Sequence, residues 1–124
     1  AEHFPELKIA IDHFAVRQDR HDDEAFADLD KLLALARYPN VCVKATSLPT
    51  YTADRYPYRR LHPVIRRVYD AFGPRRIFWG SDLSKMPCPY RDCVTMFTEG
   101  IPWLSNDDKE WIMGRALCEW LGWP

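Results

Sequence analysis

Three short apolar runs alternate along the chain with longer segments whose apolar residues recur at helical spacing. The runs are "LKIAIDHF" (7–14), "NVCVKATS" (40–47) and, inside "GPRRIFWGSDLS" (73–84), the triplet Ile77, Phe78 and Trp79. A triplet of large apolar residues after a Gly-Pro pair is too short for a helix and is typical of a buried strand in a parallel sheet. The pattern therefore predicts three strands.

The segments between and after these runs predict helices. The expected helices cover about 23–37, 58–72, 90–98 and 105–121. The apolar stripe of the first consists of Phe26, Leu29, Leu32, Leu33 and Ala36. The last begins with Ser105 and Asp108 in the arrangement of a capping box. Alternation of strands and helices of these lengths predicts parallel βαβ units, that is, a single α/β domain over residues 1–124.

Each predicted strand ends on polar residues. Side chains alternate along a strand, so every second residue shares a face. The groups expected on one face are Ile9, Ile11 and His13; Cys42, Lys44 and Thr46; and Phe78, Gly80 and Asp82. If all three faces form the interior of a barrel, His13, Lys44 or Thr46, and Asp82 converge near its mouth.

Structural explanations compete with a functional site at these positions. Asp82 can cap the turn that follows the third strand, together with Ser81 and Ser84. A lone histidine at a strand end, such as His13, is more often a hydrogen-bonded structural residue than a ligand. Three consecutive units with polar ends favour a site, because ligands gather at the carboxyl ends of parallel strands.

Composition and charge narrow the class of protein. Hydrophobic residues make up 47% of the 124 residues and charged residues 28%, which is the balance of a globular domain. The net charge of -1 provides no field for binding nucleic acid or anionic membrane, and neither a membrane span nor a signal peptide is expected. The four cysteines lack a Cys-x-x-Cys pair, which favours reduced thiols and a cytoplasmic location.

The loop after the second strand holds further candidates for substrate binding. Tyr51 and Arg55 lie on the side where substrates enter, and a planar or anionic substrate suits them. A tyrosine-rich loop that packs on its own helices explains the same residues equally well. Two other groups have structural explanations: Asp22 and Asp23 as caps of a helix, and the Cys88 and Cys93 pair as structural or incidental.

Four motifs carry a resemblance to a known family. They are "IDHF", "LARYPNVCVKATSL", "GPRRIFWGSD" and "LSNDDKEWIMGRALCEWLGW". In this order they resemble the C-terminal part of the amidohydrolase-related metal-dependent hydrolases. That group includes decarboxylases of the aminocarboxymuconate semialdehyde type and pyrone dicarboxylate lactonases.

The resemblance implies a distorted (β/α)₈ barrel of which the three strands are the sixth, seventh and eighth. It places Asp82 where the family's aspartate contacts a divalent metal, zinc being expected, and exchanges a proton with water or substrate. It places His13 as a base, an electrophile or a metal ligand. A small-molecule substrate is implied, with Lys44, Thr46, Tyr51 and Arg55 as candidates for binding it.

The chain also departs from the family pattern. It contains no His-x-His pair, and a barrel of this class needs about 250 residues. Arg115 stands where the family usually has Asn before Ala. The chain is therefore expected to be the C-terminal portion of a barrel.

Two functions remain open for such a chain. One is metal-assisted hydrolysis or non-oxidative decarboxylation of a small carboxylated, lactone or amide substrate by the parent protein. The other is a non-catalytic barrel fragment that self-associates as a homo-oligomer, most simply a two-fold dimer.

Overall fold

A parallel sheet of three strands lies at the centre of the computed structural model, which describes residues 1–124. The strands are β1 (Ile9–Ile11), β2 (Val41–Thr46) and β3 (Ile77–Gly80), in the spatial order β1-β2-β3. Both pairs are parallel. The central strand is the most buried of the three, as expected for a strand with neighbours on both sides. The predicted parallel α/β arrangement is confirmed.

The connection between β1 and β2 differs from the single helix expected over 23–37. It forms two short helices, α1 (Asp22–Ala25) and α2 (Leu29–Leu33), followed by a 3₁₀ turn over Ala34–Arg37. The break lies at Phe26 to Asp28, where the backbone leaves the helical region. The carbonyl of Ala25 accepts a hydrogen bond from the backbone N–H of Arg17 at 2.9 Å. This tertiary contact, which a helical periodicity does not reveal, accompanies the interruption.

The helices that flank β3 are closer to expectation. α3 (His62–Phe72) begins four residues later than predicted, because Tyr58 adopts a left-handed conformation and a 3₁₀ turn precedes the helix. Pro63 lies in its first turn, where a missing N–H is tolerated. α4 (Tyr90–Thr98) has the predicted bounds.

The C-terminal segment is helical but not one regular helix. It contains α5 (Asn106–Glu110), a π-helical stretch over Trp111–Arg115, and α6 (Ala116–Leu121). The predicted capping box at the start of α5 is confirmed, since the Ser105 hydroxyl accepts from the Asp108 N–H at 3.1 Å. None of the helices combines the length and apolar character that a membrane-spanning helix requires.

The strand register decides which face of the sheet each side chain occupies. Ile9 pairs with Val41 and Ile11 with Val43, so these two isoleucines share the face of the larger core rather than that of Cys42. The expectation that Ile9 and Ile11 lie on the same face as Cys42 and Phe78 is therefore wrong. Alternation orders residues within one strand, but only the pairing with β2 relates β1 to its neighbour.

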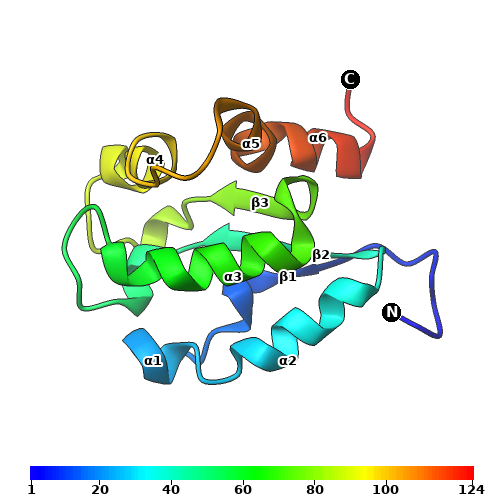
Figure 1. Ribbon diagram of the computed structural model, residues 1–124, viewed down its shortest axis with the longest axis horizontal. Coiled ribbons are helices and arrows are strands. Elements are labelled where there is room, and N and C mark those ends of the chain that lie inside the picture. Colours follow the sequence, from blue (N-terminus) through cyan, green and yellow to red (C-terminus); the bar gives the residue numbers. More distant parts are fainter.

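Helices cover both faces of the sheet. The larger core contains side chains of α2, α3 and α4, among them Leu32, Ile65 and Phe97. On the other face, Cys42 and Phe78 pack against Trp111 and Ala116 of the C-terminal segment. In Figure 1, α3 crosses in front of the strands, α4, α5 and α6 follow one another above β3, and α1 and α2 lie below β1. The carboxyl ends of the strands remain open.

Candidate active site

A polar pocket of about 400 Å³ opens at the carboxyl ends of the three strands. Its lining consists of Asp12, His13, Lys44, Thr46, Asp82 and Lys85. All three strands contribute, because the carboxyl ends of parallel strands meet at one edge of a sheet. Four of the six residues that the sequence indicates as candidates, His13, Lys44, Thr46 and Asp82, lie together in this pocket.

His13 reaches the pocket by a turn and not by strand alternation. β1 ends at Ile11, and the chain enters a 3₁₀ turn over Asp12–Ala15 in which His13 has a φ of 50°. Its imidazole Nδ1 lies 2.6 Å from the hydroxyl of Thr46 and 3.2 Å from the carbonyl oxygen of the same residue. The sequence therefore indicates a residue that lies in the pocket, whereas the alternation argument for its position is wrong.

Asp82 lies two residues beyond β3, also in a left-handed conformation with a φ of 50°. It precedes the 3₁₀ turn over Leu83–Lys85 but makes no side-chain capping bond to it. Its Oδ2 instead accepts a hydrogen bond from the Ser47 hydroxyl at 2.9 Å and lies 3.6 Å from His13 Nε2. The alternative explanation of Asp82 as a helix cap is thus not supported by the geometry.

Each strand is followed by a residue with positive φ other than glycine. These residues are His13, Ser47 and Asp82. The side chains of His13 and Ser47 each contact that of Asp82. The left-handed region costs roughly 1–2 kcal/mol for a residue with a Cβ. Such strain clusters at functional sites, where the surrounding structure holds it in place.

Three residues at the site were not identified from the sequence: Asp12 and Lys85, which line the pocket, and Ser47, which contacts Asp82. The Lys85 ammonium lies 3.7 Å from Asp82 Oδ2. Ser47 is 1% exposed and donates to the same oxygen. The available signal was their position, since each lies within five residues of a strand end.

Lys44 is held by an ion pair with Asp12 at the side of the pocket formed by β1 and β2. The hydrogen bond from Lys44 lowers the pKa of the Asp12 carboxyl below its ordinary value. Lys44 therefore places a positive charge in the pocket, next to the carboxylate of Asp12. The Lys44 side chain is 40% exposed.

Tyr51 and Arg55 do not lie in the pocket lining. Tyr51 is 2% exposed, its ring centroid is 6.2 Å from that of His13, and its hydroxyl donates to Gln18 at 3.4 Å. Arg55 is exposed on the loop beyond. Tyr58 of the same loop is buried in the larger core, so the explanation of this loop as packing on its own elements fits better than substrate contact.

The side chains present do not form a complete metal site. No three His, Cys, Asp or Glu residues come together in a group able to hold a metal ion. His13 Nε2 and Asp82 Oδ2 are two donors, whereas a catalytic zinc takes three protein ligands and a water. These 124 residues by themselves therefore do not fit a catalytic zinc ion.

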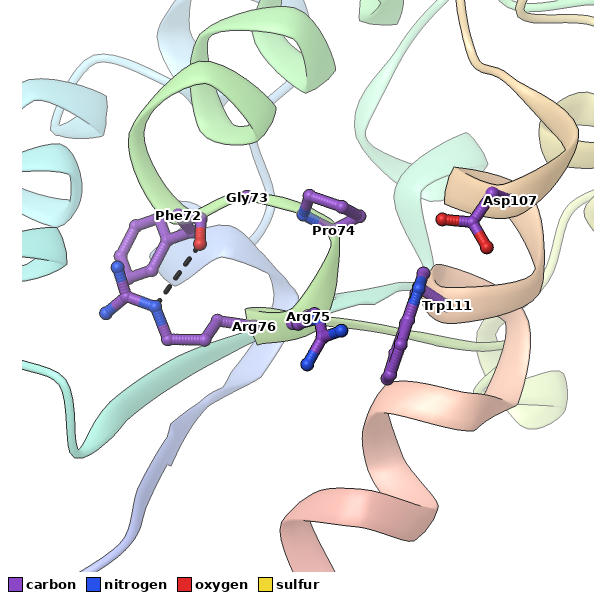
Figure 2. Close-up of a pocket in the computed structure, with 7 residues that line it drawn as sticks. All are labelled: Phe72, Gly73, Pro74, Arg75, Arg76, Asp107 and Trp111. Atoms are coloured by element: carbon purple, nitrogen blue, oxygen red, sulfur yellow. Dashed lines mark hydrogen bonds between the residues drawn. The ribbon is translucent and has the colours of Figure 1, made fainter.

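A second hollow, of about 500 Å³, lies at the opposite end of β3 (Figure 2). Its two arginines have structural partners. Arg76 donates to backbone carbonyls, and Arg75 stacks on the Trp111 ring at 4.1 Å and pairs with Glu119 at 3.6 Å. Although this hollow is larger, the pocket of His13 and Asp82 is the better candidate, because its polar groups converge on open space.

Comparison with known proteins identifies the family and the fold of the chain. The chain is 35% identical over 82 residues to an L-fucono-1,5-lactonase of Burkholderia ambifaria, a match that covers 66% of this chain and 28% of that protein. A crystal structure of an amidohydrolase from Burkholderia multivorans with bound zinc superposes with a TM-score of 0.80 at 22% identity. That superposition covers 99% of this chain and 46% of the other.

A crystal structure from Pseudomonas putida, described as a 2-pyrone-4,6-dicarboxylic acid hydrolase, superposes with a TM-score of 0.65 at 22% identity. It covers 94% of this chain and 43% of that one. The chain thus spans less than half the length of these relatives, and its α/β fold corresponds to that part of an amidohydrolase barrel. The sequence model of the amidohydrolase family matches residues 1–116, and the chain therefore belongs to the amidohydrolase family.

Proposed function

We propose that the protein hydrolyses a small lactone and that Asp82 and His13 carry the proton transfers. The observation that supports this most directly is the 3.6 Å separation of His13 Nε2 and Asp82 Oδ2 at the carboxyl ends of the strands. A carboxylate and an imidazole at this spacing can share one water molecule or one substrate oxygen.

Lactone hydrolysis adds one water across the acyl carbon–oxygen bond of the ring. A base takes a proton from the water as its oxygen bonds to the carbonyl carbon, and an acid returns a proton to the departing ring oxygen. Asp82 is suited to the first step, because Ser47 and Lys85 hold its carboxylate toward the pocket. His13 is suited to the second, since its Nε2, 3.6 Å from Asp82 Oδ2, can take up the proton that Asp82 removes from the water and donate it to the ring oxygen.

Lys44 supports the choice of substrate class. Its ammonium lies in the pocket lining beside Asp12 and offers a positive charge to the carbonyl oxygen, or to the carboxylate that ring opening produces. Of the activities that the sequence leaves open, lactone hydrolysis is also the one for which a relative at 35% identity is named. Non-oxidative decarboxylation is the alternative that the assay must exclude.

The expected divalent metal remains a proposal for the whole protein. His13 and Asp82 are the two donors that these residues can supply to it, and the remaining ligands must lie outside positions 1–124. The shortage of ligands also supports the second candidate, a barrel fragment without activity of its own.

The test is Asp82→Asn with Asp70→Asn as its matched control. Asp70 is an exposed aspartate of α3 paired with Arg66 at 2.9 Å, so the same chemical change there leaves the pocket intact. Hydrolysis of a panel of sugar-acid γ- and δ-lactones is followed by acid release with a pH indicator. We expect kcat to fall about 10²-fold or more in Asp82→Asn and to be unchanged in Asp70→Asn.

Two outcomes reject the proposal. One is an Asp82→Asn variant with the wild-type rate on a lactone that the wild type hydrolyses. The other is a folded wild-type protein, loaded with zinc, that opens no lactone of the panel; release of carbon dioxide from aromatic or unsaturated acids would then identify the decarboxylase alternative.

A further inference from the structure

Thr46 lies in the pocket, but its polar atoms point at His13 and not at open space. Its hydroxyl is 2.6 Å and its carbonyl oxygen 3.2 Å from the same imidazole nitrogen, Nδ1. Thr46 itself is only 9% exposed. A residue with both oxygens committed to a neighbour has little left to offer a substrate.

The carbonyl oxygen of Thr46, and not its hydroxyl, favours one tautomer of the imidazole. The hydroxyl at 2.6 Å can donate or accept and fits either tautomer, whereas a hydrogen bond to the carbonyl oxygen at 3.2 Å needs the proton on Nδ1, because a carbonyl oxygen only accepts. The neutral ring then carries its free electron pair on Nε2. That nitrogen faces Asp82 Oδ2 at 3.6 Å, beyond direct hydrogen-bond distance, so two acceptors point at one position in the pocket.

Gly80 determines whether Thr46 can hold this position. The register places Gly80 beside Thr46 on the neighbouring strand. A Cβ at residue 80 would lie 2.7 Å from the Thr46 methyl carbon Cγ2, closer than real contacts allow. The backbone of Gly80 is not left-handed, so the glycine is needed here for space rather than for conformation.

We propose that Thr46 is a positioning residue that holds His13 as the Nδ1–H tautomer. The missing side chain of Gly80 leaves the room that the Thr46 methyl group needs in this position. Threonine is stiff about χ1, so pushing its methyl aside rotates the hydroxyl away from the imidazole. The arrangement leaves Nε2 as an acceptor toward the pocket. This inference rests on the proposed function only in taking His13 as a proton-transferring residue.

The contact between Gly80 and the Thr46 methyl predicts a specific suppressor. Gly80→Ala should disturb His13 when Thr46 is present, and should do so much less in the Thr46→Ser background. Serine keeps the hydroxyl for Nδ1 but lacks Cγ2, the atom with which a Cβ at residue 80 collides. Thr46→Val keeps the backbone carbonyl but loses the hydroxyl that holds the imidazole within reach of it, so this variant should disturb His13 without any change at Gly80.

The primary measurement is the tautomer of His13 by long-range ¹H–¹⁵N correlation NMR, at about pH 8.5, where imidazole is ordinarily neutral. His13→Gln assigns the signal among the four histidines. We expect a pure Nδ1–H pattern in the wild type and in Thr46→Ser. We expect a mixed or Nε2–H pattern in Thr46→Val and Gly80→Ala, and recovery of the wild-type pattern in Gly80→Ala with Thr46→Ser.

Turnover provides a second readout. Misplacement of a reacting group by about 1 Å can cost about 10²-fold in rate, so kcat should fall by that order in Gly80→Ala, with little change in KM, and recover in the double variant. A merely structural role would change thermal stability and leave the tautomer as it is.

The two proposals fail independently. If the tautomer responds as described while no lactone is hydrolysed, the positioning role stands and the proposed function falls. If Asp82-dependent hydrolysis is found while His13 keeps one tautomer in every variant, or is Nε2–H in the wild type, the positioning role is wrong.

Discussion

Arg76 is a partly buried charge on which the start of β3 depends, and its replacement by lysine is the most informative stability test. Its Nε donates to the carbonyl of Phe72 at 3.2 Å, as Figure 2 shows. Its Nη atoms donate to the carbonyls of Ala36 and Tyr38 at 2.9 Å and of Val41 at 3.2 Å. No carboxylate is paired with it, and burial lowers the pKa of its guanidinium. One side chain therefore links the ends of α3 and of the α2 connection to the sheet.

The size of the effect follows from the number and direction of these bonds. A hydrogen bond to a charged group contributes about 1.5–3 kcal/mol. The planar guanidinium of arginine directs its N–H donors to carbonyls on several sides. Lysine has all its donors on one nitrogen atom and cannot reach all of these carbonyls at once. With the loss of at least two bonds, partly replaced by water, we expect Arg76→Lys to lower the free energy of unfolding by about 3 kcal/mol. For a domain of this size that corresponds to a fall in Tm of roughly 10 °C.

Arg75→Lys is the matched control, because it makes the same change at the neighbouring position. Arg75 is exposed and contacts only the Trp111 ring and Glu119, so a loss of less than about 1 kcal/mol is expected. Urea denaturation followed by circular dichroism gives both values. Equal losses in the two variants would falsify the assignment of Arg76 as the link between these elements.

Two further predictions concern pH and assembly. Hydrogen bonds from Lys44 and Thr52 hold the pKa values of Asp12 and Asp22 below the ordinary 3.8, so the unfolded chain takes up these protons first as the pH falls. Their contribution to stability is present above about pH 4 and is lost below it, and a Tm that stays constant from pH 4 to pH 2 would contradict this. The open edges of β1 and β3 predict self-association of the chain at micromolar concentration, and sedimentation that shows a stable, cooperatively unfolding monomer would rule it out.

Local sequence was sufficient to predict the elements on which the site is built. The apolar runs that became β2 and β3 are bounded by turn residues, and a capping box such as that of Ser105 and Asp108 involves only neighbouring residues. Polar residues directly after each strand indicated His13 and Asp82, because the carboxyl ends of parallel strands share one edge whatever the details of packing.

Tertiary structure alone decided how those residues meet. The face of Ile9 and Ile11 depends on the register with β2, which is a long-range pairing that alternation within β1 cannot specify. The left-handed turn that brings His13 to Thr46, and the position of Ser47 beside Asp82, join residues more than thirty positions apart. Such contacts depend on packing against the whole sheet, and for that reason the sequence indicated four of the six residues that line the pocket but not which of them hold the others in place.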